Sequence, residues 1–332
     1  MNNIIVRSVR IAGTGSYLPE TIVTNAQLEC QVPTTDAWIQ EYVGVKERRI
    51  AAPQQTTSDI AAESARRAMD SAGLLPEDID LIIVATATPD RLAPSTACIV
   101  QEKIGAVNAA AFDIGAVCSG FLYAMSVGVQ FIASGTYDHV LLIGADTFSR
   151  ITDWRDRACV FFGDGAGAAI LTHADDDSGF LAIDLYADGR GKLNFTVPAG
   201  GSEMPASAET IENGLHTFKM NGKAVYETGT TVLPDAIKKV LARCEMTVDD
   251  IDILIPHQPS IRILRATAEK IGLPFDKVMT NMQRYANTAG ATVPIILDEA
   301  NRNGKLKHDA IIAFAAVGSG WTWAAALLRW VE

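Results

Sequence analysis

The sequence predicts an α/β fold built from two duplicated halves, and three observations support this prediction. Residues 75–84 are echoed by residues 247–256, and each of the two segments follows a helical stretch. Residues 163–171, a Gly-x-Gly turn followed by small and apolar residues, are echoed by residues 318–328 in the same order along the chain. The candidate strands are continuously apolar, which is typical of sheets covered on both faces.

The two halves are expected to meet at the acidic run 175–177, which resembles a linker. Residues 1–175 are the predicted N-terminal half, which carries the nucleophilic cysteine discussed below. Residues 176–332 are the predicted C-terminal half, which carries a histidine and an asparagine for the same site. A chain of 332 residues is long enough for a large core.

Composition excludes several classes of protein. The net charge of −11 and the lack of a basic run argue against a nucleic-acid binder. No apolar run approaches the ~20 residues that a membrane span needs, and the N-terminus does not resemble a signal peptide. The five cysteines are scattered and form no Cys-x-x-Cys motif. We therefore expect no disulfide framework, no metal site and a cytoplasmic location.

Boundary signals place the first elements of the chain. Residues 6–16 indicate an opening strand and a glycine turn. Thr35 is the expected cap of a short helix that ends near Gly44. Ser58 is the expected cap of a helix over residues 59–72, because Gly73 follows as a stop signal.

Further strands are expected over residues 81–85 and 140–144 in the first half, and over 253–256 and 311–317 in the second. Residues 187–214 are too long for a plain connection, so they form either a loop at the mouth of a site or a partly disordered segment. The helix expected over residues 223–243 contains Pro234, which predicts a kink or break.

The segment around Cys118 organises the chain. Residues 109–117 predict a buried strand, and residues 119–134, which are apolar or small on every side, predict a buried helix. Cys118 therefore lies at a strand-to-helix junction, where free N–H groups and the helix dipole favour a thiolate and lower the pKa of a cysteine. A nucleophile and a small buried hydrophobic residue are both consistent with this position.

Three loops at predicted strand ends could meet Cys118, because sites in α/β folds are usually built there. His257 ends one strand, Asn287 lies in a loop of small residues, and Gly318–Ser319 follows another strand. Cysteine, histidine and asparagine together suit thioester chemistry. Each of these residues also has a structural interpretation, as a core histidine, a turn asparagine and a plain glycine turn. The glycine run 163–167 resembles a dinucleotide motif only loosely and is better explained as a tight turn.

In their order along the chain, these motifs resemble those of the β-ketoacyl-acyl carrier protein synthase III family, within the thiolase superfamily. The resemblance extends over nearly the whole chain. It is carried by Asp113, residues 118–121, 162–167 and 256–258, Asn287, Thr288, residues 318–320, Thr322 and Trp323.

The resemblance implies a five-layered αβαβα thiolase fold, a homodimer and no metal or organic cofactor. It implies that acyl-CoA acylates Cys118 and that decarboxylated malonyl-acyl carrier protein then attacks, giving a β-ketoacyl product and CO2 for fatty acid synthesis. His257 and Asn287 would bind the thioester oxygen and assist decarboxylation. The backbone N–H groups of Cys118 and Ser319 would form the oxyanion hole.

The resemblance also suggests how substrates bind. Trp38 and Arg157 match positions that hold the adenine of CoA, and Met220 and Gly222 lie in the segment that lines the pantetheine tunnel. Arg262 matches a basic residue that docks the acyl carrier protein.

Three departures from the family pattern bear on substrate binding. Tyr42 stands where an arginine for a CoA phosphate is common, and Glu227 stands near a common lysine, so positive charge is missing where polyanions approach. Ala93 replaces a bulky residue that closes the acyl pocket across the dimer in some members, which predicts a longer or branched acyl primer.

Two other classes of function are compatible with the same residues. The first is an acyltransferase or a ketosynthase of secondary metabolism, which keeps the acyl-enzyme but uses a different acceptor. The second is an inactive partner subunit, which the intact Cys118, His257 and Asn287 argue against. A cysteine hydrolase is disfavoured because so apolar a setting should exclude water.

Overall fold

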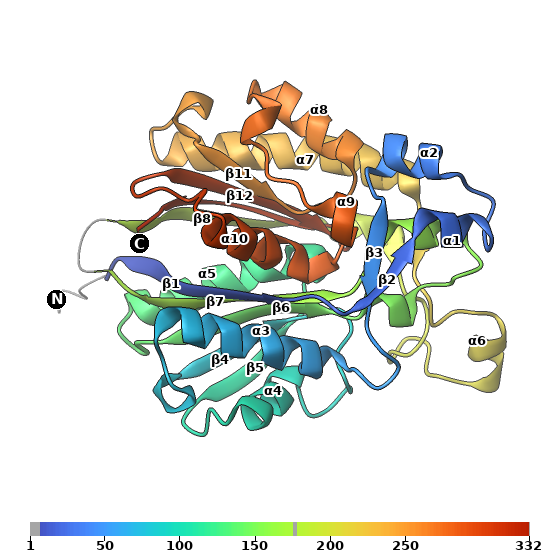
Figure 1. Ribbon diagram of the computed structural model, residues 1–332, viewed down its shortest axis with the longest axis horizontal. Helices are drawn as coiled ribbons and strands as arrows, with labels where there is room; N and C mark the ends of the chain where they lie inside the picture. The colour runs from blue at the N-terminus through green and yellow to red at the C-terminus, as the bar shows by residue number, and fades with distance from the viewer. Residues whose placement is uncertain (1–6, 175–177, 332) are drawn as a thin grey trace.

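The computed structural model describes residues 7–174 and 178–331, so the predicted linker 175–177 lies outside the described residues. Two sheets enclose a pair of central helices, and further helices cover the outer face of each sheet (Figure 1). The molecule therefore has five layers in the order αβαβα, as the resemblance implied, and the sequence itself predicted a layered α/β arrangement of two related halves.

The two sheets have the same plan. The first has the order β1-β7-β6-β4-β5 and the second the order β8-β13-β12-β11, read from the matching edge. In each sheet a parallel pair lies beside an antiparallel pair. The parallel pairs are β4 with β6 and β11 with β12. The antiparallel pairs are β6 with β7 and β12 with β13. The strands are β1 (Val9–Tyr17), β4 (Leu81–Ala85), β5 (Ala110–Ile114), β6 (Val140–Asp146), β7 (Gly165–His173), β8 (Gly179–Ala187), β11 (Ile253–Pro256), β12 (Ile311–Gly318) and β13 (Thr322–Arg329). The matching orders confirm the internal duplication.

The helices also follow the duplication, because helices at corresponding places in the two halves occupy corresponding layers (Figure 1). The longer helices are α3 (Thr57–Ala72), α4 (Thr96–Ile104), α5 (Gly120–Ala133), α7 (Gly222–Arg243), α8 (Ile261–Ile271) and α10 (Thr292–Arg302). The shorter elements are α1 (Asn25–Glu29), α2 (Asp36–Trp38), α6 (Ala208–Glu212), α9 (Met282–Tyr285), β2 (Thr21–Thr24), β3 (Glu47–Ile50), β9 (Phe195–Thr196) and β10 (Lys219–Met220).

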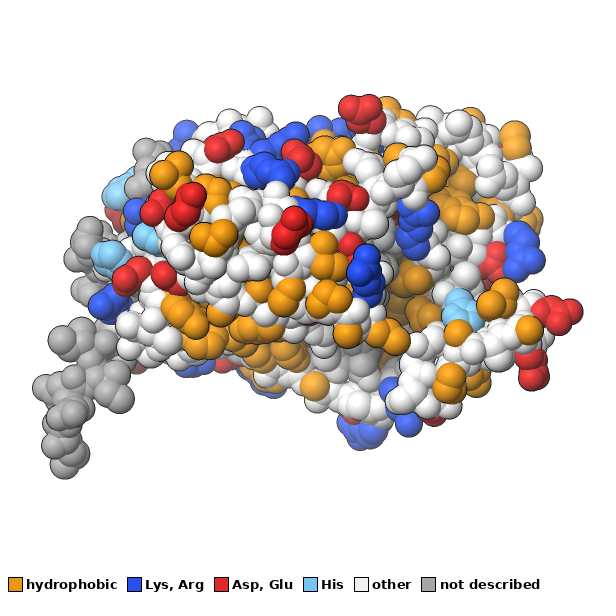
Figure 2. All heavy atoms as spheres, turned by 90° about the horizontal axis from the view of Figure 1, so that it is seen from below, with side chains coloured by type: hydrophobic (Ala, Val, Ile, Leu, Met, Phe, Trp, Pro, Cys, Tyr) orange, Lys and Arg blue, Asp and Glu red, His pale blue; other side chains and the backbone are white. Residues whose placement is uncertain are grey.

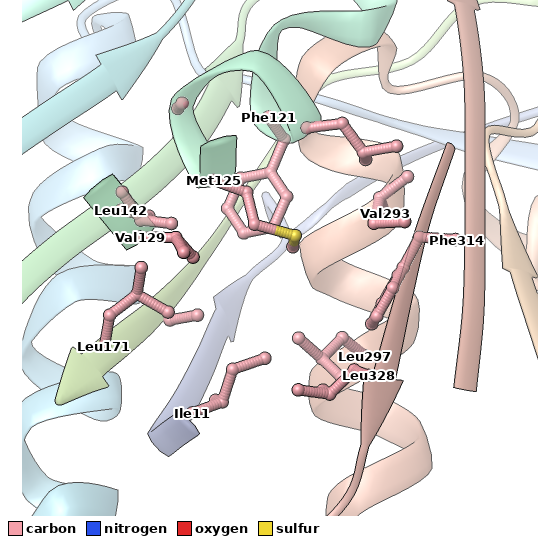
Figure 3. Packing of buried hydrophobic residues seen from close by; sticks show 14 of the residues in the cluster. Ile11, Phe121, Met125, Val129, Leu142, Leu171, Val293, Leu297, Phe314 and Leu328 are labelled. Carbon is pink, nitrogen blue, oxygen red and sulfur yellow. The ribbon is translucent and has the colours of Figure 1, made fainter. Parts of the chain in front are cut away.

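The central layer forms the main hydrophobic core. Phe121 and Met125 of α5 point toward Val293 and Leu297 of α10, and the inner faces of both sheets close around them (Figure 3). A fully buried side chain of this size stabilises the fold by about 1.5–3 kcal/mol relative to an exposed one. This packing fixes α5, and with it the position of Cys118 at its N-terminal end.

Several helix boundaries were predicted correctly, and one cap was wrong. Thr35 caps α2, and the following turn of helix ends at Gly44 with φ +92°. The cap of α3 is Thr56 rather than Ser58, because the Thr56 side chain accepts from Asp59 N and the Asp59 carboxylate accepts from Thr56 N. Ser58 lies inside the helix, and its hydroxyl donates to Asp90.

The strand before Cys118 was predicted to be buried, and this prediction was wrong. β5 is the edge strand of its sheet, with β4 on one side only among the described residues. Ala110 is exposed, and the other residues of β5 are half-buried. Its sequence is apolar, but the fold leaves one side of it uncovered within a single chain.

A kink or break was predicted at Pro234, and no break occurs, since α7 runs without interruption through that residue. Proline has no N–H group and leaves the carbonyl of Thr230 without its helical donor. The Lys270 ammonium on α8 donates to that carbonyl at 2.7 Å. A side chain from the neighbouring helix therefore replaces the missing hydrogen bond.

Candidate active site

A cavity of about 230 Å³ lies where the two halves meet. Its lining includes Cys118 from the first half, and His257, Asn287 and Ser319 from the second. Four of the residues for which the resemblance implied substrate contacts or carrier docking line it too, namely Trp38, Met220, Gly222 and Arg262. Strand ends of both halves therefore build one site, as the sequence predicted.

The long segment 187–214 is ordered and contains the short elements β9 and α6. Phe195 of β9 lines the cavity, which supports the interpretation as a loop at the mouth of a site. The face drawn in Figure 2 is hollowed beside the part of the molecule that carries α6, and apolar side chains lie within the hollow.

Cys118 lies in a single turn of helix, Val117–Ser119, that leads directly into α5. Val117 has φ +46°, a conformation that is strained for a β-branched residue and directs the chain sharply into the helix. Burial, and after it the negative charge of Asp146, raises the pKa of the Cys118 thiol. The sequence predicted a lowered pKa from the helix end, so this prediction was wrong. Loss of solvent around the thiol on burial raises its pKa more than the helix end lowers it.

His257 follows β11 and is anchored by its backbone N–H, which donates to Ala315 O at 2.8 Å. The ring is buried, and burial lowers its pKa to about 3, so the imidazole is neutral at pH 7. The Nδ1 atom has no hydrogen-bond partner in the described part of the chain. A neutral imidazole in the cavity can take or give one proton.

Asn287 is held by its own loop. Its Oδ1 atom accepts a hydrogen bond from Ala289 N at 2.8 Å, and its backbone N–H donates to Phe161 O at 2.9 Å. Ala286 and Ala289 have φ values of +58° and +49°. Because Oδ1 is occupied, the Nδ2 donors of the amide are left to face the cavity.

Gly318, which precedes Ser319, packs against the turn that carries the nucleophile. A Cβ atom on Gly318 would lie 2.8 Å from Ala116 O and 3.0 Å from Cys118 N, so only glycine fits there. The Ser119 hydroxyl donates to Thr322 Oγ1 at 2.8 Å and ties the two halves together next to the site. The Gly318 and Cys118 backbones therefore approach each other at the junction of the halves.

Stacked aromatic and guanidinium groups line the mouth of the cavity. The Arg157 guanidinium carbon lies 3.6 Å from the centroid of the Trp38 ring, and Trp38 also stacks on Tyr42 at 5.2 Å. Arg262 lies 5.0 Å from the Tyr42 ring and 5.7 Å from the Tyr226 ring. Arg157 does not line the cavity itself. A base inserted between Trp38 and Arg157 would have to separate them.

Sequence reasoning missed the aromatic wall beside the nucleophile. The Phe162 ring stacks on Phe148 at 4.4 Å and meets Phe218 edge-on at 4.9 Å, in the same hydrophobic cluster as Cys118. Phe195 and Trp321 also line the cavity. Only Phe162 had a signal, because it begins the glycine turn 163–167. Ala93 does not line the cavity of the single chain.

A thiolase fold with cysteine, histidine and asparagine around one apolar cavity defines an acyl-transferring condensing enzyme. Family models described as 3-oxoacyl-[acyl-carrier-protein] synthase III and as its C-terminal part match residues 112–189 and 241–330. The chain belongs to the β-ketoacyl-acyl carrier protein synthase III family. The family, fold and class of enzyme predicted from the sequence are thereby confirmed.

Relatives match over almost the full length. A β-ketoacyl-[acyl-carrier-protein] synthase III of Caldanaerobacter subterraneus is 52% identical over 96% of this chain and 97% of its own. The solved 3-oxoacyl-[acyl-carrier-protein] synthase III of Aquifex aeolicus has a TM-score of 0.90 and 40% identity, covering 97% of this chain and 100% of that one. A priming β-ketosynthase of a polyketide pathway has a TM-score of 0.92 and 28% identity, covering 100% and 99%.

Proposed function

We propose that this protein starts acyl chains by condensing the acyl group of an acyl-CoA with malonyl-acyl carrier protein. One observation carries the proposal: Cys118, His257 and Asn287 converge on a single apolar cavity at the junction of the halves. This arrangement can hold an acyl-enzyme, polarise a thioester oxygen and exclude water.

The first step is transfer of the acyl group to the cysteine. The neutral His257 imidazole takes the Cys118 proton, and the thiolate attacks the thioester carbonyl. The backbone N–H groups of Cys118 and Ser319 bind the oxyanion. The carbon–sulfur bond to CoA breaks, and the leaving thiolate takes the proton back from His257.

The second step forms the new carbon–carbon bond. The malonyl thioester loses CO2, and the enolate oxygen is bound by His257 and by the free Nδ2 donors of Asn287. The enolate carbon attacks the acyl carbonyl, the bond to Cys118 Sγ breaks, and the released Cys118 thiolate takes up one proton from solvent water. Neither step needs a metal or an organic cofactor.

Substrate contacts follow the residues at the mouth. Trp38 and Arg157 would hold the adenine of CoA after they separate, and Met220 and Gly222 would line the path of the pantetheine. Arg262 is exposed and stacked on Tyr42, so its charge is available to a phosphate or to an acidic carrier protein.

The free edge of β5 supports a homodimer, because an unpaired apolar edge favours association with another strand. In such a dimer Ala93 would meet the acyl pocket of the partner and leave room for a longer or branched primer. All five cysteines are free, which supports a reducing compartment such as the cytoplasm. No helix among the described residues could span a membrane.

Intact-protein mass after incubation with a panel of acyl-CoAs tests the proposal. Wild type should gain the mass of one acyl group, and Cys118→Ala should gain none. Cys159→Ala is the matched control, because Cys159 is also fully buried and free, and it should be acylated like wild type. Malonyl-acyl carrier protein should then remove the acyl group with release of CO2.

Two outcomes would overturn this function. Release of the acyl group to a hydroxyl or an amine, without CO2, would identify the acyltransferase alternative. Absence of any mass gain in wild type would exclude acyl-CoA as the donor.

A further inference from the structure

A buried carboxylate lies behind the nucleophile, and the mechanism above does not use it. Asp146 ends β6 and has no exposed surface. Its Oδ1 atom accepts hydrogen bonds from Ala87 N at 2.8 Å, from Thr88 Oγ1 at 3.0 Å and from Thr86 Oγ1 at 3.2 Å. None of the ion pairs in the described part of the chain includes Asp146, so only neutral donors stabilise its charge.

The second oxygen of the carboxylate reaches the other half of the molecule. Asp146 Oδ2 accepts from Gly290 N at 2.8 Å. Gly290 is wedged in place, because a Cβ there would lie 3.1 Å from Asp146 Oδ2 and 3.3 Å from Val117 O. The carboxylate therefore connects the loop after β4 to the loop that carries Asn287.

The hydrogen bond from Gly290 N to Asp146 lies one residue along the chain from Ala289 N, the group that orients the Asn287 side chain. Ala289 N donates to Asn287 Oδ1, and Ala289 is held at a positive φ of +49°. A strained residue keeps such a conformation only where its neighbours fix it. The hydrogen bond from Gly290 N to Asp146 supplies that restraint on the C-terminal side.

The carboxylate also lies near the thiol. The charge of Asp146 acts on the Cys118 thiol, and the groups that donate to the carboxylate are hydroxyl and backbone groups. Burial raises the pKa of Asp146 to about 6, against the effect of its hydrogen bonds, so the carboxylate is mostly ionised at pH 7. The negative charge of Asp146 disfavours a thiolate at Cys118. The positive imidazolium that forms when His257 accepts the proton offsets this effect.

We infer that Asp146 is a positioning residue for the condensation, which holds the Asn287 loop through Gly290 and places a negative charge behind Cys118. The inference rests on the proposed function. It assigns Asp146 two separable effects, one on the geometry of Asn287 and one on the ionisation of the nucleophile.

Asp146→Asn tests both effects. Asparagine offers only one oxygen, so it cannot accept from both Ala87 N and Gly290 N. We expect kcat for condensation to fall about tenfold or more, since a well-placed oxyanion donor is worth about 10²–10³ in rate, while KM for acyl-CoA stays within about twofold. The pH profile of Cys118 alkylation by iodoacetamide should shift about one pH unit toward lower pH, because the negative charge near the thiolate is lost.

Asp164→Asn is the matched control. Asp164 is equally buried and accepts from Ala51 N and from Ser149, but its charge does not act on Cys118. This variant should lose stability and keep the wild-type alkylation profile. If Asp146→Asn does not fold, Asp146→Ser also removes the charge and should shift the profile in the same direction.

An unchanged alkylation profile in Asp146→Asn, or in Asp146→Ser where that variant is needed, would overturn the electrostatic effect. A shifted profile with unchanged kcat would overturn the positioning effect. Alkylation needs no acyl substrate, so a wild-type enzyme that fails to condense would refute the proposed function while this measurement still decides the electrostatic effect of Asp146.

Discussion

The backbone nitrogen of Cys118 lies so close to Gly318 that no side chain fits on Gly318. A Cβ atom on Gly318 would be 3.0 Å from that nitrogen, although the two residues are 200 positions apart and belong to different halves. The end of β12 therefore packs directly against the turn that carries the nucleophile. Ser319, whose N–H group is the second proposed oxyanion donor, is the next residue along the chain after Gly318.

Gly318→Ala should slow acylation of Cys118 about 10²-fold, because the methyl group separates the two proposed oxyanion donors. The measurement is the rate of mass gain with a saturating acyl-CoA. Gly115→Ala is the control, since a Cβ at that position meets nothing within 4 Å, and it should react like wild type. An unchanged rate in Gly318→Ala would show that the close approach is not required.

His257→Gln should reduce the loss of stability on acidification. The pKa of His257 is about 3 in the folded protein and about 6.5 in an unfolded chain. Between these values only the unfolded state binds the proton, so the free energy of unfolding falls as the pH drops from 6.5. Asp146, with its pKa raised to about 6, acts in the opposite direction between about pH 4 and 6 in both proteins.

Urea unfolding at several pH values between 7 and 4 measures this difference. The stability of His257→Gln relative to wild type should increase steadily as the pH falls. His308→Gln, a substitution at an exposed histidine, controls for the introduction of glutamine. Parallel curves for wild type and His257→Gln would contradict the prediction.

Arg157→Ala should raise KM for acyl-CoA about fivefold to tenfold, because the guanidinium would lose its stacking on the adenine. KM for the corresponding acyl-pantetheine, which has no adenine, should not change. Arg155→Ala is the control, because Arg155 is a neighbouring exposed arginine that pairs with Asp153. Equal changes with both substrates would show that Arg157 does not contact the nucleotide.

Ala93→Phe should shift the preferred primer toward short, unbranched acyl groups, because a larger side chain would fill the pocket of the partner subunit. Competition between acyl-CoAs of different length, followed by intact mass, measures the preference. Ala93→Ser nearly preserves the volume and should behave like wild type. A wild-type enzyme that accepts only acetyl-CoA would contradict the prediction.

Ala110→Glu should convert a dimer to a monomer. Ala110 is exposed on the free edge of β5, so a single chain tolerates the charge, whereas a dimer would bury two like charges. Light scattering after gel filtration measures the mass. Leu75→Glu, at another exposed apolar residue, should leave the dimer intact. A dimeric Ala110→Glu protein would exclude β5 as the interface.

The sequence predicted most strands within one or two residues and placed Cys118, His257 and Asn287 at strand or loop ends. It misplaced the cap of α3, since Thr56 and Ser58 offer the same kind of oxygen and only the geometry of Asp59 distinguishes them. It predicted a break at Pro234, because the compensating donor, Lys270, belongs to another helix. No sequence pattern indicated Phe195 as part of the aromatic wall, because its loop has a role only once the fold places it at the cavity.

By itself, the sequence determined a layered α/β fold, its duplication and the residue types of the site, because periodicity, boundary residues and motifs act over short stretches of chain. The five-layer order came from the family resemblance. Tertiary structure decided which groups meet and in what ionisation state. Burial reversed the expected direction of the Cys118 pKa, and Asp146 gained contact with Gly290 only through the packing of the two halves. Desolvation and long-range contacts depend on atoms far apart in the chain, so no local pattern records them.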